Sequence, residues 1–418
     1  MKDNNIKIND FFHDLEIIGS AADDISKFYA MHKKLFNNSE KECKIDVNKS
    51  PILLTSSDTK NAYKNANFKQ IEKIVKDSDD DTRVIYTNIK DNGVKAWTKV
   101  SSGGKEFYMS FSNKASIWCM TEKTEKILTK EGDIKYSAVV QMGIYSSSGQ
   151  IAGINAYNIT LPILLSEVVL ALLVARLISF AIAEGASFLI ASILSRMGAF
   201  AVEIGLGPVS FIIGSYALSA VVASLIFAIV FVGIMYLWNW VNKKYTIKLQ
   251  IFNWDENYIW NIVDDYLLNA KLANDEHNRE HDFYISLPKM IKPNETITPP
   301  GFNPIVPLDS ICHYCIFIFE NDSTFLQGCS FVLKIQKDKN SEGFMYAFEC
   351  PRFSDNKQAA DDGITQPKYY YENVKWNNNP ISFNIQSTKD KTPVSFQLDA
   401  LRGAKNDTYN VLININKK

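Results

Sequence analysis

A long apolar stretch with few charges separates two polar regions of the chain. Residues 136–242 contain only five Asp, Glu, Lys or Arg side chains, whereas the other 311 residues contain 86. The last part of the stretch, Ile204–Asn242, has no charge in 39 residues. About 20 consecutive apolar residues are enough to cross the hydrocarbon core of a bilayer. The pattern therefore predicts membrane contact, and a long central helix in a soluble core is the alternative.

The uncharged segment ends in residues that are typical of a membrane boundary. Trp238 and Trp240 precede Lys243, Lys244 and Tyr245, and amphipathic rings followed by cations are common where a bilayer meets water. We therefore predict that the segment inserts. The side chains expected to insert or to anchor it are Phe211, Ile212, Ile213, Ala220, Val222, Ala223, Leu225, Ile226, Ile229, Phe231, Trp238 and Trp240.

The preceding residues, 161–202, are apolar but carry small residues at every fourth position. On a helix, residues four apart form a ridge, and a ridge without bulk lets a second helix approach closely, in a membrane or in a soluble bundle. This ridge comprises Ala171, Ala175, Ser179, Ala183, Ser187, Ala191, Ser195 and Ala199. Charged side chains within a bilayer are energetically costly. We therefore expect the charged residues of this part to face a water-filled lumen or to pair with one another; they are Glu167, Arg176, Glu184, Arg196 and Glu203.

A turn is predicted between these two apolar parts. Gly205, Gly207 and Pro208 interrupt helical backbone, because glycine is conformationally permissive and proline lacks an N–H group. The expected result is a hydrophobic helical hairpin over residues 160–242, with arms of about 161–204 and 209–242.

The N-terminal part predicts helices followed by a small β-rich region. Residues 1–81 are polar, with an amphipathic pattern in 8–36 that favours one or two helices. In residues 82–159, the β-branched run Val84–Ile89 and the run Val94–Val100 flank Asn92-Gly93, which is a strong hairpin signal. We therefore expect strands from residue 82 onwards.

Residues 243–418 predict a C-terminal antiparallel β-sandwich. Short strand-like runs recur between turn residues. These runs are Tyr314–Phe319, Phe331–Ile335, Phe344–Phe348, Ser382–Ile385, Val394–Leu398 and Tyr409–Ile415. Tyr369, Tyr370, Tyr371 and Trp376 form an aromatic group that belongs either to a docking face or to the core. The expected fold class is thus a multidomain α+β protein with a central helical hairpin.

This layout resembles that of α-helical pore-forming toxins and colicin-type channel domains. The resemblance covers the hairpin of about 80 residues and the polar regions beside it, and no motif of one particular family is present. It implies a protein that is soluble at first, then inserts its hairpin into a target-cell bilayer as a homo-oligomer and causes cytolysis. The C-terminal domain would then bind a lipid, glycan or protein receptor. The alternatives are a resident integral membrane protein and a soluble binding protein whose hairpin is core.

The net charge and the N-terminal sequence limit the classes of partner and the route of export that we expect. The net charge is −1, with 45 basic and 46 acidic residues, so no basic field favours nucleic acid. The N-terminus, MKDNNIKIND, is charged and lacks the apolar run of a signal peptide. We therefore expect release or delivery by a non-classical route.

The six cysteines are sparse and irregular, which predicts mostly reduced thiols with one bridge possible among the last four.

Candidate catalytic and metal-binding motifs are weak. His277-Asn-Arg-Glu-His281 matches the inverted zinc-protease pattern, but it lies in a polar junction without a third ligand. Cys312 and Cys315 have zinc-knuckle spacing without a second pair, and on a strand their side chains would point to opposite faces. Phosphate-binding and nucleophile-elbow motifs are absent from the sequence. We therefore predict no enzyme activity, no cofactor and no metal.

Overall fold

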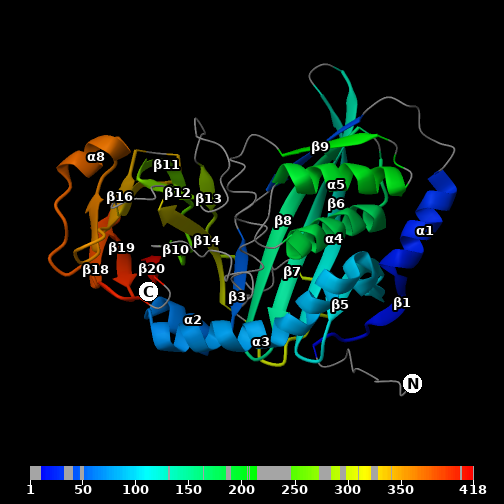
Figure 1. The fold of residues 1–418 in the computed structure, drawn as a ribbon, viewed down its shortest axis with the longest axis horizontal. Coiled ribbons are helices and arrows are strands. Elements are labelled where there is room, and N and C mark those ends of the chain that lie inside the picture. The colour runs from blue at the N-terminus through cyan, green and yellow to red at the C-terminus, as the bar shows by residue number, and fades with distance from the viewer. Residues whose placement is uncertain are drawn as a thin grey trace.

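A computed structural model gives the fold of most of the chain. It describes residues 11–32, 41–47, 51–129, 132–162, 164–184, 190–204, 206, 208–213, 246–272, 284–291, 298–308, 310–321, 328–339, 341–404 and 407–417. The described part is rich in strands, which form a large mixed sheet of 15 strands and a smaller sheet of five. Figure 1 shows the two sheets and the helices that cover them.

The large sheet runs through both halves of the molecule. Its N-terminal strands are β1 (Glu16–Ser20), β2 (Lys41–Val47), β3 (Ile52–Thr55), β4 (Thr98–Ser102), β5 (Lys105–Phe111), β6 (Ala115–Leu128), β7 (Ile134–Ser146), β8 (Ile151–Leu161) and β9 (Val209–Ile213). Its C-terminal strands are β10 (Thr246–Asn253), β12 (Ala270–Leu272), β14 (Ser310–Asn321), β18 (Ser382–Ser387), β19 (Thr392–Leu398) and β20 (Thr408–Ile415). The main strand order is β1-β4-β5-β6-β7-β8-β3-β14-β10-β20-β19-β18.

Strand β3 joins the two halves. It pairs with β8 on one side, where Ile52 lies opposite Ile154, and with β14 on the other, where Ile52 lies opposite His313. All four β3 residues are buried, as expected for an apolar strand in the middle of a sheet. The N-terminal and C-terminal halves therefore share backbone hydrogen bonds.

The C-terminal half contains a second core between the two sheets. The smaller sheet has the order β13-β11-β15-β16-β17. Its strands are β11 (Trp260–Leu268), β13 (Ile285–Leu287), β15 (Cys329–Lys337), β16 (Gly343–Cys350) and β17 (Lys357–Asp362). Aromatic rings fill the interface: Phe319 stacks on Phe331 with centroids 3.9 Å apart, and Tyr346 stacks on Phe396 at 5.4 Å.

All six C-terminal runs that were expected to be strands lie within strands, but the predicted antiparallel sandwich needs correction. The runs fall in β14, β15, β16, β18, β19 and β20. However, β10 and β20 are parallel, with Ile247 opposite Tyr409, and the larger sheet continues into the N-terminal half. Periodicity marks a strand but does not specify its partner, so it could not reveal either feature.

Helices cover one face of the N-terminal part of the sheet. They are α1 (Ala21–His32), α2 (Ser57–Lys64), α3 (Phe68–Asn92), α4 (Glu167–Glu184) and α5 (Ile190–Glu203), with the 3₁₀ turn η2 (Gly93–Ala96) between α3 and β4. A further short helix, α8 (Pro367–Asn373), packs on the smaller sheet. In Figure 1, α4 and α5 lie across the strands β5 to β8.

Helix α3 replaces the strand and hairpin expected from residue 82. Val84–Ile89 is helical, and Asn92 ends α3 rather than starting a two-residue β-turn. The buried residues Ile71, Ile74, Ile85 and Ile89 recur at helical spacing, so one face of the helix meets the core. The β-branched residues of Val84–Ile89 favour a strand, but the helical spacing of apolar residues along the whole of α3 outweighs this local preference.

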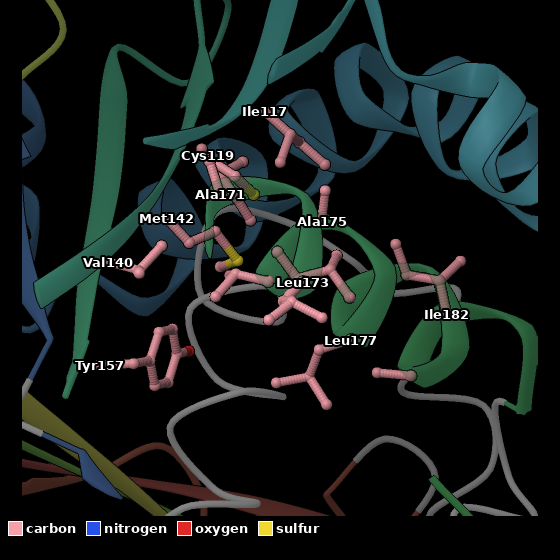
Figure 2. Packing of buried hydrophobic residues seen from close by; sticks show 14 of the residues in the cluster. Ile117, Cys119, Val140, Met142, Tyr157, Ala171, Leu173, Ala175, Leu177 and Ile182 are labelled. Atoms are coloured by element: carbon pink, nitrogen blue, oxygen red, sulfur yellow. The ribbon is translucent and has the colours of Figure 1, made fainter. Parts of the chain in front are cut away.

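Helix α4 packs flat on the sheet as part of the main core. Leu170, Leu173 and Ile178 are at most 1% exposed, and the helix contacts β5, β6, β7, α3 and α5. Figure 2 shows its side chains against Ile117, Cys119, Val140 and Met142 of the sheet. A helix that is apolar all round is expected in the interior of a protein, and burial explains this part of the apolar stretch.

The predicted central helical hairpin is wrong as a description of this fold. Its first arm consists of two separate elements, α4 and α5, and the start of its second arm, Val209–Ile213, is strand β9. Strand β9 pairs in parallel with β2, with Ile212 opposite Lys44. Residues 214–245 lie outside the described residues. Apolar composition alone did not distinguish a short paired strand from a helix.

The resemblance to α-helical pore-forming toxins is also wrong, and so is the expected multidomain α+β fold class with a central helical hairpin. The structure is mostly β. Within the described ranges, none of the helices combines the length and apolarity needed to cross a bilayer. The strand-rich architecture, with its helices packed on a large sheet, replaces that layout.

Candidate functional site

The β6–β7 hairpin projects beyond the rest of the sheet and carries exposed apolar side chains at its tip. Figure 1 shows it above β9 and α5. Leu128 is 72% exposed, Ile134 46% and Ile127 39%. Apolar side chains of this size are usually buried, so three of them around one turn form a candidate binding surface.

Hydrogen bonds join the two strands where they approach the hairpin tip. The Thr129 N–H donates to the Asp133 carbonyl at 2.9 Å, and the Gly132 N–H donates to the Thr129 carbonyl at 3.1 Å. The Thr129 hydroxyl accepts from the Asp133 N–H at 3.1 Å. Gly132 has a positive φ of 88°, a conformation that glycine adopts without strain. The apolar side chains thus lie beside the hydrogen-bonded residues Thr129, Gly132 and Asp133.

Each face of the hairpin tip carries both apolar and basic groups. Leu128 pairs with Ile134, and Ile127 pairs with Lys135. Paired residues share a face and successive residues alternate, so Leu128 and Ile134 project from one face, together with Lys126, while Ile127 projects from the other. Lys126 and Lys135 are exposed. Neither face of the tip is wholly polar.

Other exposed apolar side chains lie at the same end of the sheet. Strand β8 ends at Leu161, opposite Tyr136 at the base of the hairpin extension, and Leu164 follows it at 63% exposure. Lys44 of β2 pairs with Thr160 of β8 and with Ile212 of β9. We call this surface the apolar end; its exposed members are Ile127, Leu128, Ile134, Leu164, Val202 and Ile212.

Helix α5 supports the apolar end. It packs on β9 so closely that a Cβ on Gly198 would lie 2.9 Å from the Val209 carbonyl oxygen. Met197 and Phe200 are buried, whereas Val202, near the end of the helix, is 52% exposed. The absence of a side chain at Gly198 allows α5 to lie close to β9, and Val202 lies one helical turn further along the same helix.

A small apolar pocket also opens at this end. Its volume is about 160 Å³, and its lining comprises Phe28, Leu164, Leu165, Ser166, Val169, Ile204 and Leu206. Most of its lining atoms belong to apolar side chains. The single hydroxyl, that of Ser166, accepts from the Val169 N–H at 3.4 Å as the start of α4. The described lining of the pocket therefore suits an apolar group.

The predicted small-residue ridge divides into buried and exposed parts. Ala171, Ala175 and Ser179 are buried on α4, where the Ser179 hydroxyl accepts from the Trp97 indole N–H at 2.9 Å and donates to the Ala175 carbonyl. Ala183, Ser195 and Ala199 are exposed. Ala191 lies in α5, and Ser187 is outside the described residues. The buried members pack against strands and an indole, a contact that helix periodicity did not indicate.

The predicted charged positions have different surroundings. Glu167, Arg196 and Glu203 are exposed, and Glu184 ends α4. Arg176 is half-buried, with its guanidinium 4.2 Å from the centroid of the Phe180 ring. Burial lowers the pKa of Arg176, Glu203 opposes this effect, and Arg196 adds to it. The structure therefore places Arg176 against aromatic rings in the α4–α5 region.

The predicted insertion and turn residues are only partly described. Phe211 is buried, Ile212 is 36% exposed and Ile213 ends β9. Pro208 is exposed just before β9. The following predicted residues lie outside the described part of the chain: Gly205, Gly207, Ala220, Val222, Ala223, Leu225, Ile226, Ile229, Phe231, Trp238 and Trp240.

The C-terminal aromatic group mostly packs on the smaller sheet. Tyr370 is buried and donates a 2.6 Å hydrogen bond to Asp361. Tyr371 contacts the Trp376 ring edge-on with centroids 6.2 Å apart. Only Tyr369 of the four is strongly exposed, at 61%. The group therefore contributes mainly to the packing between α8 and the sheet.

The weak chemistry motifs are not assembled into a site in the described residues. Cys312 and Cys315 are buried in different core clusters on opposite faces of β14, as predicted, and burial raises the pKa of both thiols. His277 and His281 lie outside the described residues. Within the described ranges, no three His, Cys, Asp or Glu side chains are grouped to hold a metal ion.

Sequence reasoning missed the hairpin tip. The available signal was the run Lys126-Ile127-Leu128 before the polar turn and Ile134 after it. Such residues are usually directed into a core. They are exposed here because β6 and β7 pair with each other beyond the ends of their neighbours, where β8 stops opposite Tyr136.

Comparison with known proteins gives no family and no function. No family model and no curated protein matches the chain. Among solved structures, the crystal structure of IP-1A from Alcaligenes faecalis is similar to part of it, with 11% identity and a TM-score of 0.22. That similarity covers 42% of this chain and 93% of the other chain. Similarity at this level identifies neither a family nor an activity.

Proposed function

We propose that this protein binds lipid membranes through the apolar end and permeabilises them. The observation that carries this proposal is the concentration of exposed apolar side chains at one end of the sheet, led by Leu128 at 72% and Leu164 at 63% exposure. Large exposed apolar residues that are grouped on one surface usually mark an interaction site.

The two-sided hairpin tip favours a bilayer over a flat protein surface. Ile127 and Leu128 project from opposite faces of the hairpin, so a protein docked on one face would leave the other in water. A bilayer surrounds an inserted tip and covers both faces. Lys126 and Lys135 are positioned to extend their charged ends towards lipid phosphates while their alkyl stems lie on the apolar surface.

The uncharged segment supplies the length for deeper insertion. It begins at the apolar end, with Ile204 after α5 and Val209 in β9. Residues 214–242 continue it without a charge, which exceeds the length needed to cross the hydrocarbon core. We assign the first membrane contact to the hairpin tip and the permeabilising contact to residues 214–242.

The test combines vesicle flotation and dye release with protein purified without detergent. Flotation with phosphatidylcholine vesicles, alone and mixed with phosphatidylserine, reports binding, and release of an enclosed dye reports permeabilisation. The double variant Leu128→Lys/Ile134→Lys is expected to lower binding about tenfold or more, because it removes apolar contact area from the tip. Ile229→Lys is expected to retain binding and to abolish release, because a charge in the hydrocarbon is costly.

Val84→Lys is the matched control. Val84 is 65% exposed on α3. This variant adds one lysine, as Ile229→Lys does, at an exposed position outside the apolar end, and is expected to bind and release like the unmodified protein. Full release by Ile229→Lys would contradict the role of residues 214–242. Absence of flotation with both vesicle compositions would overturn the membrane proposal.

A further inference from the structure

Two cysteines lie directly opposite one another in the C-terminal core. Cys329 begins β15, Cys350 ends β16, and the two are paired in the antiparallel register. Both are buried, at 0% and 1% exposure, and both belong to the core between the two sheets. Their side chains therefore project from the same face of the smaller sheet, as directly paired residues do.

The geometry of this pair suits a disulfide. Directly opposed residues of antiparallel strands have Cα atoms roughly 4.5–5.5 Å apart, which is within the range of about 4.4–6.8 Å for disulfides. The two thiols are hydrogen-bonded to one another. A Cβ on Gly328 would lie 2.1 Å from the Cys350 carbonyl oxygen, so glycine at this position permits the close approach of the two strand ends.

The register pairs no other two cysteines. All six lie in described strands and are buried as free thiols. Cys43 lies opposite Phe211, Cys312 opposite Leu53 and Cys315 opposite Ile251. Cys119 lies between Tyr108 and Met142. The pairing therefore singles out Cys329 and Cys350.

We propose that Cys329 and Cys350 form a disulfide by exchange with a small-molecule disulfide of the oxidised glutathione class. One cysteine, as its thiolate, attacks the oxidant and forms a mixed disulfide, releasing one glutathione thiol. The second cysteine then displaces the other glutathione. Two protein thiols are oxidised, one S–S bond forms in the protein, and one S–S bond in the oxidant is reduced to two thiols.

Formation is expected while the strands assemble, rather than in the folded protein at neutral pH. The hydrogen bond to Cys350 and burial raise the pKa of the Cys329 thiol well above its usual range, and the thiolate is the reactive form. Once formed, the bond would tie β15 to β16 in the middle of the smaller sheet and would restrict the unfolded chain.

The test is refolding of the full chain in reduced and oxidised glutathione. After denaturation and alkylation, the oxidised protein is expected to show four labelled thiols of its six, with residues 329 and 350 in one linked peptide by mass spectrometry. The oxidised form is expected to melt about 4 °C above the reduced form. Cys350→Ala is expected to remove both the link and this difference.

Cys315→Ala is the matched control, because Cys315 is a buried cysteine of the same core on another strand. It is expected to retain the link between residues 329 and 350 and the difference in melting temperature. Six labelled thiols after refolding in oxidised glutathione, or a link between any other two cysteines, would overturn the proposal.

Discussion

Asp81 connects helix α3 to the turn between β7 and β8. Its carboxylate is buried and accepts hydrogen bonds from the Ser146 hydroxyl at 2.9 Å and from the Ser148 N–H and hydroxyl at 2.8 Å. Beside these contacts, a Cβ on Gly149 would lie 1.9 Å from the Ser78 hydroxyl oxygen. A buried carboxylate is stable only when its oxygens are paired in this way.

Asp81→Asn is expected to lower the free energy of unfolding by about 2 kcal/mol. The amide keeps one acceptor oxygen and replaces the other with an NH2 group. One hydrogen bond from Ser146 or Ser148 is therefore lost or reversed, and the others lose the negative charge of their acceptor. Asp80→Asn is the control, because the Asp80 side chain is 54% exposed and its ion pair with Arg83, at 3.1 Å, lies at the surface; a change of at most about 0.5 kcal/mol is expected there. Urea unfolding measures both, and equal effects would contradict the role of Asp81.

Helix α4 is a core element whose small residues determine how closely it packs. Ala171 and Ala175 are fully buried towards the sheet and its neighbouring helices, as Figure 2 shows. The Thr121 hydroxyl donates to the Glu167 carbonyl at 2.6 Å and so anchors the start of the helix to β6. The apolar character of α4 is therefore explained by packing within the protein.

Ala175→Leu is expected to destabilise the protein by roughly 1–3 kcal/mol, because Ala175 is fully buried and added methylene groups would crowd the side chains packed around it. Ala199→Leu makes the same change at an exposed ridge position of α5, and an effect within about 0.5 kcal/mol is expected. Thermal unfolding compares the two variants. A similar loss in both would contradict the division of the ridge into buried and exposed parts.

At the scale of the whole molecule, the two halves are joined by one sheet and by a polar contact across it. Asn414 of β20 is fully buried. Its amide donates to the Tyr63 carbonyl of α2 at 3.2 Å, and its oxygen accepts from the Trp254 indole N–H at 2.8 Å. Together with the pairing of β3 between β8 and β14, this contact couples the halves.

We therefore expect one cooperative unfolding transition, with coincident curves from circular dichroism and tryptophan fluorescence. Asn414→Ala is expected to lower the free energy of unfolding by about 2 kcal/mol, because it removes the acceptor of the buried Trp254 N–H and one of the donors to the Tyr63 carbonyl, which also accepts from the Ala66 N–H at 3.2 Å. Asn384→Ala, at an exposed position of β18, is the control and is expected to have little effect. Two separate transitions would contradict the coupling of the halves.

Local patterns in the sequence determined where the C-terminal strands lie and that Cys312 and Cys315 point to opposite faces of β14. The six predicted runs lie in β14, β15, β16, β18, β19 and β20, because turn residues bound each run and alternation marks a half-buried strand. The opposite orientation of Cys312 and Cys315 followed from the two-residue period of a strand. These properties depend on near neighbours in the chain.

The tertiary structure alone decided what the apolar stretch does in the described fold and where the candidate site lies. The composition showed that residues 161–213 are mostly apolar. The sheet and the neighbouring helices determined that α4 is buried in the core and that Val209–Ile213 pairs with β2. The exposure of Leu128 depends on how far β6 and β7 extend beyond β8. Register and packing between distant segments set both features, because burial depends on long-range neighbours that hydrophobic periodicity does not specify.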